Sequence, residues 1–188
     1  MDKWLEKQVL KYAGMNFGET EQTVDKNTQA WRFLCKYAKT GMTFLDLGCN
    51  NGRITNEMKQ RGLIELGIDL PEIIAKITYP INKQAMDLET QFPTGEFDLI
   101  FCRETLEHLR NSEDVCRKIL NVLKIPDGIA ILACPHDERD FGENCPEHHR
   151  LFKGQQLREM IEKLGGVVLE QFEETVCRSR GCVSKRRL

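Results

Sequence analysis

The sequence predicts an α/β protein with a doubly wound, mostly parallel sheet that carries helices on both faces. Short apolar runs alternate with segments of helical period along the whole chain, and strands of this kind are typical of parallel sheets buried on both faces. The 188 residues fit one domain with a sizeable core, and no repeat or linker divides them. A hydrophobic share of 40% and a charged share of 30% are typical of a globular chain.

Six segments are expected to form the strands of this sheet. Four are short and strongly apolar, a fifth is weaker, and a sixth lies near the end of the chain. In chain order they are Thr43–Leu47, Ile64–Ile68, the weaker region around Gln84–Met86, Phe97–Cys102, Gly128–Ala133 and Val167–Phe172.

Helices are expected between these strands. Residues 21–39 place apolar side chains at Trp31, Leu34, Cys35 and Ala38, the i, i+3, i+4, i+7 spacing of one helical face. Acids that follow a serine indicate another helix start at Ser112. The helices expected after the first strand are Arg53–Arg61, Pro71–Ile77, Ser112–Leu123 and Gly154–Leu164.

Charge and cysteine usage narrow the class of protein. The formal net charge of −2 gives no overall attraction to nucleic acid or to acidic membranes, although the last residues from Arg178 onward are basic. The first twelve residues lack the apolar core of a signal peptide, and no run is long enough to span a membrane. No pair among the eight cysteines has C-x-x-C spacing. We therefore expect a cytoplasmic protein with reduced thiols and no membrane partner.

The stretch TFLDLGCNNGR at residues 43–53 indicates a ligand-binding turn. The stretch begins with the first expected strand, which carries Asp46 near its end, and the turn after it holds Gly48 and Gly52, which let a ligand approach the backbone. Asn50 between them tolerates left-handed backbone angles. The G-x-x-x-G spacing differs from the G-x-G-x-x-G of dinucleotide-binding turns, so nicotinamide binding is disfavoured.

Acids also follow the second and third expected strands. Asp69 lies about 20 residues past the glycine turn, where an acid accepts hydrogen bonds from ribose hydroxyls; the alternative is an N-cap for the next helix. Asp87 is placed to accept a hydrogen bond from an adenine amino group, with Met86 or Leu88 packing on the ring. The competing interpretation of Asp87 is an acid in a surface turn.

At this point the chain resembles class I S-adenosylmethionine-dependent methyltransferases. Asp46, Gly48 and Gly52 match the family's acid-x-Gly-x-Gly-x-Gly motif, with Asn50 in place of the middle glycine, and further motifs follow in order from about Lys39 to Phe172. The resemblance implies a Rossmann-like methyltransferase fold with S-adenosylmethionine as cofactor. The residues it implies for cofactor binding are Asp46, Gly48, Asn50, Gly52, Asp69, Leu70, Asp87, Leu88 and Arg103.

Histidines and acids after the fourth and fifth strands are the candidates for catalysis. Glu104, His108, His148 and His149 are expected to face the methyl acceptor, with a histidine as general base. A weaker similarity to small-RNA 2′-O-methyltransferases offers an alternative, in which Glu104, Glu107, His108 and His148 bind a divalent cation. The favoured interpretation has no metal.

The predicted function is methyl transfer to an O or N nucleophile of a small or medium-sized acceptor. One alternative is metal-dependent 2′-O-methylation of an RNA terminus, and another is a non-catalytic binding protein with the same fold. Residues 1–38 are expected to form a helical cap before the cofactor-binding domain at 39–188. The last antiparallel strand usual in the family is expected to be short, displaced into Glu174–Cys177, or missing.

Overall fold

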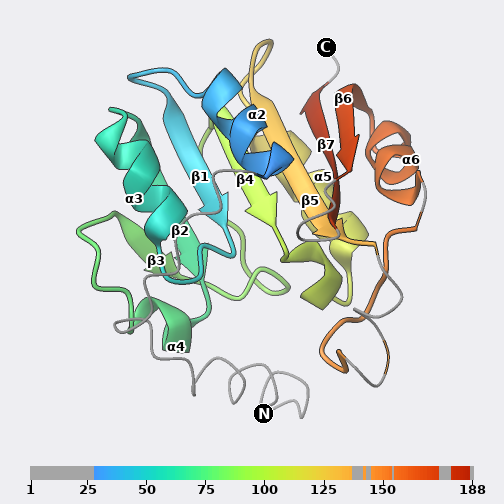
Figure 1. Ribbon diagram of the computed structural model, residues 1–188, viewed down its shortest axis with the longest axis horizontal. Helices are drawn as coiled ribbons and strands as arrows, with labels where there is room; N and C mark the ends of the chain where they lie inside the picture. Colours follow the sequence, from blue (N-terminus) through green and yellow to red (C-terminus); the bar gives the residue numbers. More distant parts are fainter. Residues whose placement is uncertain (1–27, 137–141, 143–144, 154, 174–178, 187–188) are drawn as a thin grey trace.

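The structure is a computed structural model that describes residues 28–136, 142, 145–153, 155–173 and 179–186. Within this part of the chain one sheet of seven strands forms, in the order β3-β2-β1-β4-β5-β7-β6 (Figure 1). The strands are β1 Thr43–Leu47, β2 Ile64–Asp69, β3 Lys83–Ala85, β4 Leu99–Arg103, β5 Ile129–Pro135, β6 Gly166–Glu173 and β7 Ser179–Arg186. The helices are α2 Gln29–Tyr37, α3 Arg53–Gln60, α4 Pro71–Ile74, η1 Leu106–His108, α5 Ser112–Val122 and α6 Gln156–Lys163.

The sheet reverses its strand order between β1 and β4. Strands β1 to β5 pair in parallel, with Leu45 of β1 between Leu66 of β2 and Ile100 of β4. Because the chain leaves β1 toward β2 on one side and enters β4 on the other, the loops after these two strands separate at their carboxyl ends. Ligands of open α/β sheets bind at such a point.

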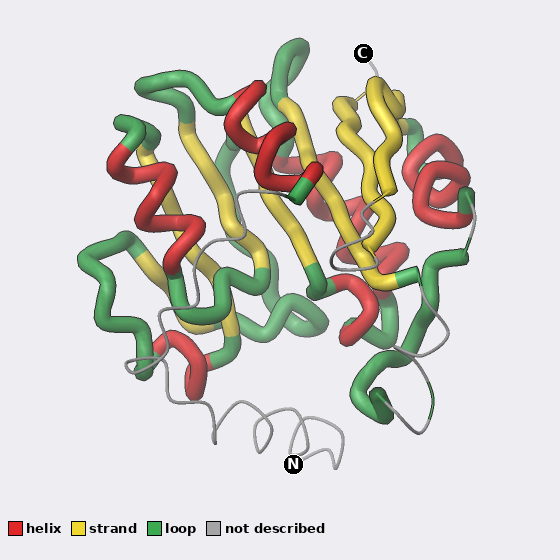
Figure 2. Tube along the Cα trace, viewed as in Figure 1, coloured by secondary structure: helices red, strands yellow, loops and turns green. Residues whose placement is uncertain are grey.

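Helices cover both faces of the sheet, as the sequence predicts (Figure 2). On one face α2 and α3 contribute Leu34 and Met58 to a cluster with Phe44 and Phe101. On the other face α5 and α6 contribute Ile119 and Ile161 to the larger cluster. This two-sided burial accounts for the apolar strands β1, β4 and β5, and it confirms the predicted fold class.

Helix α2 belongs to the sheet's own core. The hydroxyl oxygen of Thr28 accepts a hydrogen bond from the Trp31 N–H at 3.2 Å and caps the helix, and Trp31 and Leu34 are buried. The described part of the predicted cap, 28–38, therefore includes a helix that packs on the strands. The rest of that prediction, residues 1–27, lies outside the described residues.

The last antiparallel strand is present as β7 and is eight residues long, which corrects the expectation that it is short or missing. Strand β7 runs antiparallel between β5 and β6, pairing Leu132 with Cys182 and Phe172 with Gly181. It begins at Ser179, later than the predicted position, and Glu174–Cys177 lies outside the described residues. The sequence pattern is misleading here because the strand is rich in polar and basic residues although residues 181–184, which face both sides of the sheet, are buried. Helix α4 is also shorter than predicted, ending at Ile74 instead of Ile77.

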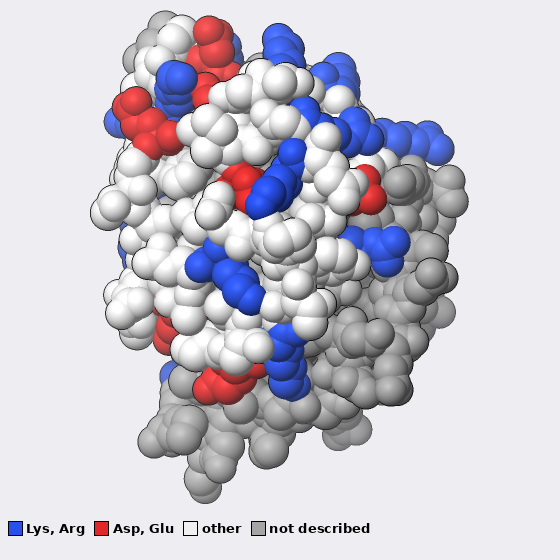
Figure 3. Space-filling view, turned by 90° about the vertical axis from the view of Figure 1, so that its left-hand side faces the viewer, with Lys and Arg blue, Asp and Glu red and all other residues white. Residues whose placement is uncertain are grey.

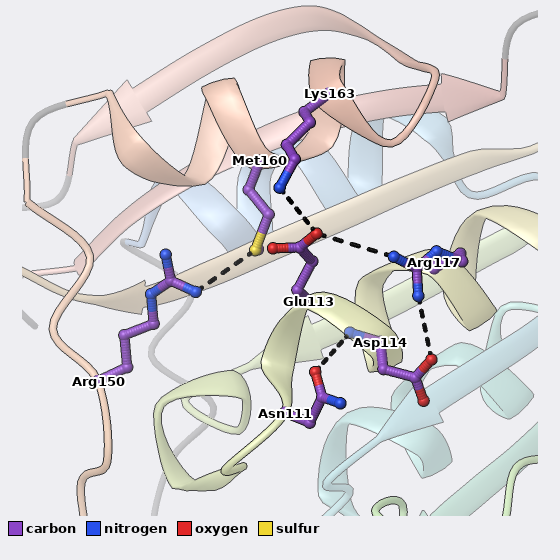
Figure 4. Close-up of polar contacts among 7 residues, drawn as sticks. All are labelled: Asn111, Glu113, Asp114, Arg117, Arg150, Met160 and Lys163. Carbon is purple, nitrogen blue, oxygen red and sulfur yellow. Dashed lines mark hydrogen bonds and ion pairs between the residues drawn. The ribbon is translucent and has the colours of Figure 1, made fainter.

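Ion pairs tie α5 to α6 on the outer surface of the larger core cluster (Figure 4). Glu113 lies between Lys163 of α6, with the oxygen and nitrogen 3.1 Å apart, and Arg117 of its own helix at 3.7 Å. Asn111 caps α5 by accepting the Asp114 N–H at 3.1 Å. Such exposed pairs contribute little stability individually. The buried contacts beneath them hold the two helices on the sheet.

The cysteines inside apolar runs are buried, as the sequence predicts. Cys102 and Cys134 are fully buried in β4 and β5, and burial raises the pKa of both thiols. Burial likewise raises the pKa of Cys116 and of Cys182 to about 12. These thiols are neutral at physiological pH and pack as small apolar groups.

No helix within the described residues is long and apolar enough to cross a membrane.

Candidate functional site

The turn between β1 and α3, residues 48–52, is called the cofactor turn here. Three of its residues have left-handed backbone angles, with φ of +72° at Gly48, +48° at Asn50 and +75° at Gly52. The N–H groups of Gly48 and Cys49 donate to the Ile68 carbonyl of β2 at 2.9 and 3.0 Å. The prediction that Asn50 accommodates a left-handed backbone angle is confirmed, and main-chain bonds hold the turn against β2.

Asp69 ends β2 directly beside the cofactor turn. One carboxylate oxygen accepts the Asn50 N–H and the other accepts the Leu70 N–H, both at 2.8 Å. Burial raises the pKa of Asp69, and these two N–H donors oppose that shift. Leu70, not Asp69, is the N-cap residue of α4, and no side chain caps that helix. The competing interpretation of Asp69 as an N-cap is therefore wrong, because its carboxylate points to the cofactor turn.

Asp46 lies beneath the cofactor turn, where it is 3% exposed. Its carboxylate accepts a hydrogen bond from the Thr55 hydroxyl of α3 at 2.7 Å. Burial raises the pKa of Asp46 to about 7, and the nearby Asp69 carboxylate acts in the same direction. The contact with Thr55 supports the turn from below, while the role of Asp46 toward a cofactor stays a prediction.

The predicted adenine residues follow β3. The Asp87 carboxylate accepts the Glu89 N–H at 2.9 Å, a local turn contact that matches the competing interpretation of this acid. Leu88 and Met86 are nearly fully buried and belong to the larger core cluster. Contact of these three side chains with a cofactor remains a prediction.

Residues 104–109 follow β4 and are called the acceptor loop. Arg103, at the end of β4, is half-buried, and Glu104 has φ of +51°, an unfavourable angle for a residue with a side chain. The Glu104 N–H donates to the Ala133 carbonyl of β5 at 2.9 Å, which fixes the start of the loop. The short helix η1 then carries Glu107 and His108, both buried.

The acceptor loop meets the histidine segment, residues 145–152. The rings of His108 and His148 pack edge to face with centroids 4.6 Å apart. His108 Nδ1 lies 3.4 Å from the Glu147 carbonyl oxygen, and its Nε2 lies 3.8 Å from a carboxylate oxygen of Glu107. A carbonyl only accepts hydrogen bonds, so Nδ1 carries the proton in that contact, and in the neutral imidazole the lone pair is then on Nε2.

Backbone and packing contacts fix the histidine segment. The His149 N–H donates to the Glu107 carbonyl at 2.7 Å, which joins the segment to the acceptor loop. Phe152 is buried in the core, and the Arg150 guanidinium lies over its ring at 4.9 Å and contacts the Met160 sulfur at 3.8 Å (Figure 4). The second half of the histidine segment is therefore anchored to the acceptor loop and to the core.

Possible metal ligands also gather here. The ligand atoms of Glu107, His108 and His148 lie within 4.8 Å of one another, and so do those of Cys145, Glu147 and His148. Sequence reasoning missed Cys145 and Glu147, although the C-x-E-H spacing was visible. Glu104 belongs to neither group, and the His149 side chain is exposed.

The cofactor that the fold implies can be tested against these residues. Asp69 uses one lone pair on each oxygen for the N–H groups of Asn50 and Leu70, and a carboxylate has about four such positions, so two remain for ribose hydroxyls. The exposed residue at position 50 and the left-handed turn around it leave the backbone accessible. The residues present fit the ribose end of S-adenosylmethionine.

The fold, together with the site at the carboxyl ends of β1 and β2, is that of a Rossmann-like nucleoside-binding protein of the methyltransferase type. The family described as "Methyltransferase domain" matches residues 20–171, so the chain belongs to that family. The predicted family, the S-adenosylmethionine-dependent methyltransferases, is thereby confirmed.

Relatives and solved structures agree with this family. A ubiquinone biosynthesis O-methyltransferase of Pseudomonas paraeruginosa is 32% identical over 104 residues, 50% of this chain and 44% of that protein. The match thus spans less than half of the relative's length. An S-adenosylmethionine-dependent methyltransferase from Mesorhizobium loti has a TM-score of 0.69 at 16% identity, covering 86% of this chain and 99% of that one.

A further solved structure shares the fold and contains the cofactor. Magnesium protoporphyrin IX methyltransferase from Synechocystis PCC 6803, solved with bound S-adenosylmethionine, has a TM-score of 0.64 at 15% identity, and the match covers 98% of this chain and 81% of that one. At these identities the solved structures establish the fold.

Proposed function

We propose that this chain transfers the methyl group of S-adenosylmethionine to a hydroxyl oxygen of a small or medium-sized acceptor. The observation that carries the proposal is the Asp69 carboxylate, bonded to the cofactor turn at 2.8 Å at the point where the strand order reverses. The name of the O-methyltransferase relative supports oxygen as the acceptor atom. Bound S-adenosylmethionine supplies an electrophilic methyl group on a sulfonium that leaves as a neutral thioether.

The acceptor loop supplies a base for the hydroxyl proton. With Nδ1 held by the Glu147 carbonyl, His108 Nε2 can accept a proton from an acceptor hydroxyl. The Glu107 carboxylate, 3.8 Å from Nε2, then stabilises the imidazolium that forms. His148 packs on the edge of His108 and restricts its ring. Glu104, His149 and Arg103 stay predicted acceptor-facing residues.

Calorimetric titration of S-adenosylhomocysteine tests the cofactor half of the proposal. The wild-type protein is expected to bind it, and Asp69→Ala to lose about 1–3 kcal/mol of binding free energy, because ribose hydroxyls lose their acceptor. Asp127→Ala is the matched control, since Asp127 is an exposed aspartate in the turn before β5. A folded wild-type protein that binds no S-adenosylhomocysteine would contradict the proposal and favour a non-catalytic binding protein.

A screen with labelled S-adenosylmethionine tests the transfer itself. Small hydroxyl-bearing molecules are offered in pools, and methyl incorporation is measured with wild type and with Asp69→Ala. Transfer to an alcohol or phenol that the variant fails to support is the expected result. Label found only on amines would correct the acceptor atom from oxygen to nitrogen.

A second candidate is a metal-dependent enzyme that methylates the terminal 2′-hydroxyl of RNA. The grouping of Glu107, His108 and His148 ligand atoms within 4.8 Å favours it. The charge distribution does not: the net charge is −2, and on the face seen in Figure 3 basic side chains are interspersed with uncharged and acidic ones. We therefore keep the small-molecule acceptor as the first candidate.

Metal analysis separates the two candidates. The purified protein is assayed for bound zinc, magnesium and manganese, and transfer is measured with and without a chelator. Activity that survives chelation excludes the metal-dependent candidate. Dependence on magnesium or manganese supports it, whereas bound zinc indicates that the Cys145 thiolate takes part, since thiolates favour zinc over magnesium.

A further inference from the structure

We infer that Thr105 is a positioning residue that couples the cofactor turn to the acceptor loop. It lies where the strand order reverses, at the loop after β4 and against the turn after β1. The inference rests on the proposed function, because it assumes that the cofactor turn binds S-adenosylmethionine. It goes beyond methyl transfer itself, because it states that ligand binding at the cofactor turn stabilises the loop that carries Glu107 and His108.

The side chain of Thr105 is packed directly on the cofactor turn. Its hydroxyl lies 3.2 Å from the Leu47 carbonyl of β1 and 3.0 Å from the carbonyl of Arg103. A Cβ added at Gly48 would lie 2.1 Å from that hydroxyl oxygen and 2.9 Å from the Thr105 methyl carbon. Gly48 is therefore required both by its φ of +72° and by the presence of Thr105.

The main chain of Thr105 holds the acceptor loop. Its carbonyl accepts the His108 N–H at 3.0 Å, which closes the single turn of η1. Thr105 is the N-cap residue of η1, a position where a threonine hydroxyl commonly caps its own helix, yet this side chain makes no capping bond. The hydroxyl is directed to β1 instead, so one residue contacts the turn with its side chain and the loop with its carbonyl.

The cofactor turn, which Thr105 contacts, and Glu104, which precedes it, are each fixed to a neighbouring strand. The cofactor turn is bonded to the Ile68 carbonyl through the N–H groups of Gly48 and Cys49, and Glu104 is bonded to Ala133. Glu104 has a positive φ of +51°, which packing must maintain, whereas Gly48 adopts its positive φ without strain. A ligand that stabilises the turn therefore stabilises the Thr105 contact, and with it the η1 hydrogen bond.

Hydrogen–deuterium exchange of residues 104–109 tests the coupling in the full-length protein. S-adenosylhomocysteine is expected to slow exchange at the His108 amide by roughly tenfold in the wild type, a size typical of coupling between sites. Thr105→Val keeps the side-chain shape but removes the hydroxyl, and it should reduce this protection to less than about threefold while the ligand still binds. Thr105→Ser keeps the hydroxyl and should preserve most of the protection caused by S-adenosylhomocysteine.

A purely structural role would give a different result. Thr105→Val would then speed exchange equally with and without ligand, and the protection caused by S-adenosylhomocysteine would stay at its wild-type size. That outcome overturns the coupling, as does a wild type that binds the ligand without any protection of the loop. A folded wild type that binds no ligand overturns the proposed function and the coupling together.

A double-mutant cycle supplies an independent readout. Gly48→Ala should weaken binding of S-adenosylhomocysteine at least about tenfold, and Thr105→Ala in the same chain should restore part of it, because contacting residues couple by roughly 2- to 150-fold. Gly41→Ala is the control for backbone strain: its φ is +85° and a Cβ there meets no atom within 4 Å. If the two changes are additive in a protein that binds the ligand, the coupling is excluded.

Discussion

The cofactor turn is positioned by main-chain N–H groups that bond to residues nearby in the sequence, whereas the predicted catalytic histidines come from two loops far apart in the sequence. Gly48 and Cys49 donate to Ile68, and Asn50 donates to Asp69, all within about one β-α-β unit. His108 instead meets His148, 40 residues later, across a ring contact of 4.6 Å. The first region needs particular backbone angles, and the second needs two loops to converge.

This difference predicts separable effects of substitution. A change in the cofactor turn should reduce cofactor binding, and transfer falls with it. A change at His108 or His148 should leave cofactor binding intact and reduce transfer alone. Because Thr105 contacts both regions, it is the residue at which this separation should fail.

The largest expected effect comes from His108→Asn. Transfer to the acceptor found in the screen should fall about 100- to 10,000-fold, the usual contribution of a general base, because Nε2 no longer accepts the proton. Calorimetry should show binding of S-adenosylhomocysteine within about threefold of wild type, since the ring nitrogens of His108 face Glu147 and Glu107 and the main-chain bond to Thr105 is kept.

Added imidazole distinguishes the two roles of His108. Rescue of transfer in His108→Asn by free imidazole supports a base, whereas loss of bound metal in the variant supports a ligand. A parallel loss of S-adenosylhomocysteine binding would contradict the separation of the two regions. Asn111→Ala, in the exposed turn just after the acceptor loop, is the control for general damage.

The next effect concerns Asp46 and the pH dependence of stability. Burial raises its pKa from 3.8 to about 7 in the folded protein, so the folded state holds a proton that the unfolded chain releases. The free energy of unfolding should therefore fall as the pH rises from about 4 to about 7, by up to about 4 kcal/mol from this group. Asp46→Asn, which resembles the protonated acid, should remove that part of the fall.

Chemical denaturation at several pH values measures this pH dependence of the free energy of unfolding. Asp127→Asn, at an exposed turn, should keep the wild-type pH profile. Identical profiles for wild type and Asp46→Asn would show that Asp46 is ionised without cost in the folded state. The expected result would separate the two residues: Asp46 changes the free energy of unfolding, and His108 changes the rate of transfer.

The contrast also explains what the sequence could predict. The fold class, most of the strands and the left-handed turn at Asn50 depend on local pattern and spacing, and the structure confirms them. The grouping of Cys145 and Glu147 with His148 depends on a loop that folds back on the acceptor loop, which no short-range pattern encodes. Strand β7 was missed for a related reason, since tertiary pairing with β5 and β6 overrides its polar composition.

The smallest expected effect is that of Asn111→Ala. The Asn111 side chain accepts the Asp114 N–H at 3.1 Å and caps α5, the helix that follows the acceptor loop. Loss of such a cap costs about 1 kcal/mol of the free energy of unfolding, measured by denaturant titration. Binding of S-adenosylhomocysteine and transfer should both stay close to wild type, because the main-chain hydrogen bonds of Thr105 and Glu104 that hold the acceptor loop do not involve the Asn111 side chain. A loss of transfer without a loss of cofactor binding would instead show that the start of α5 also positions the acceptor loop.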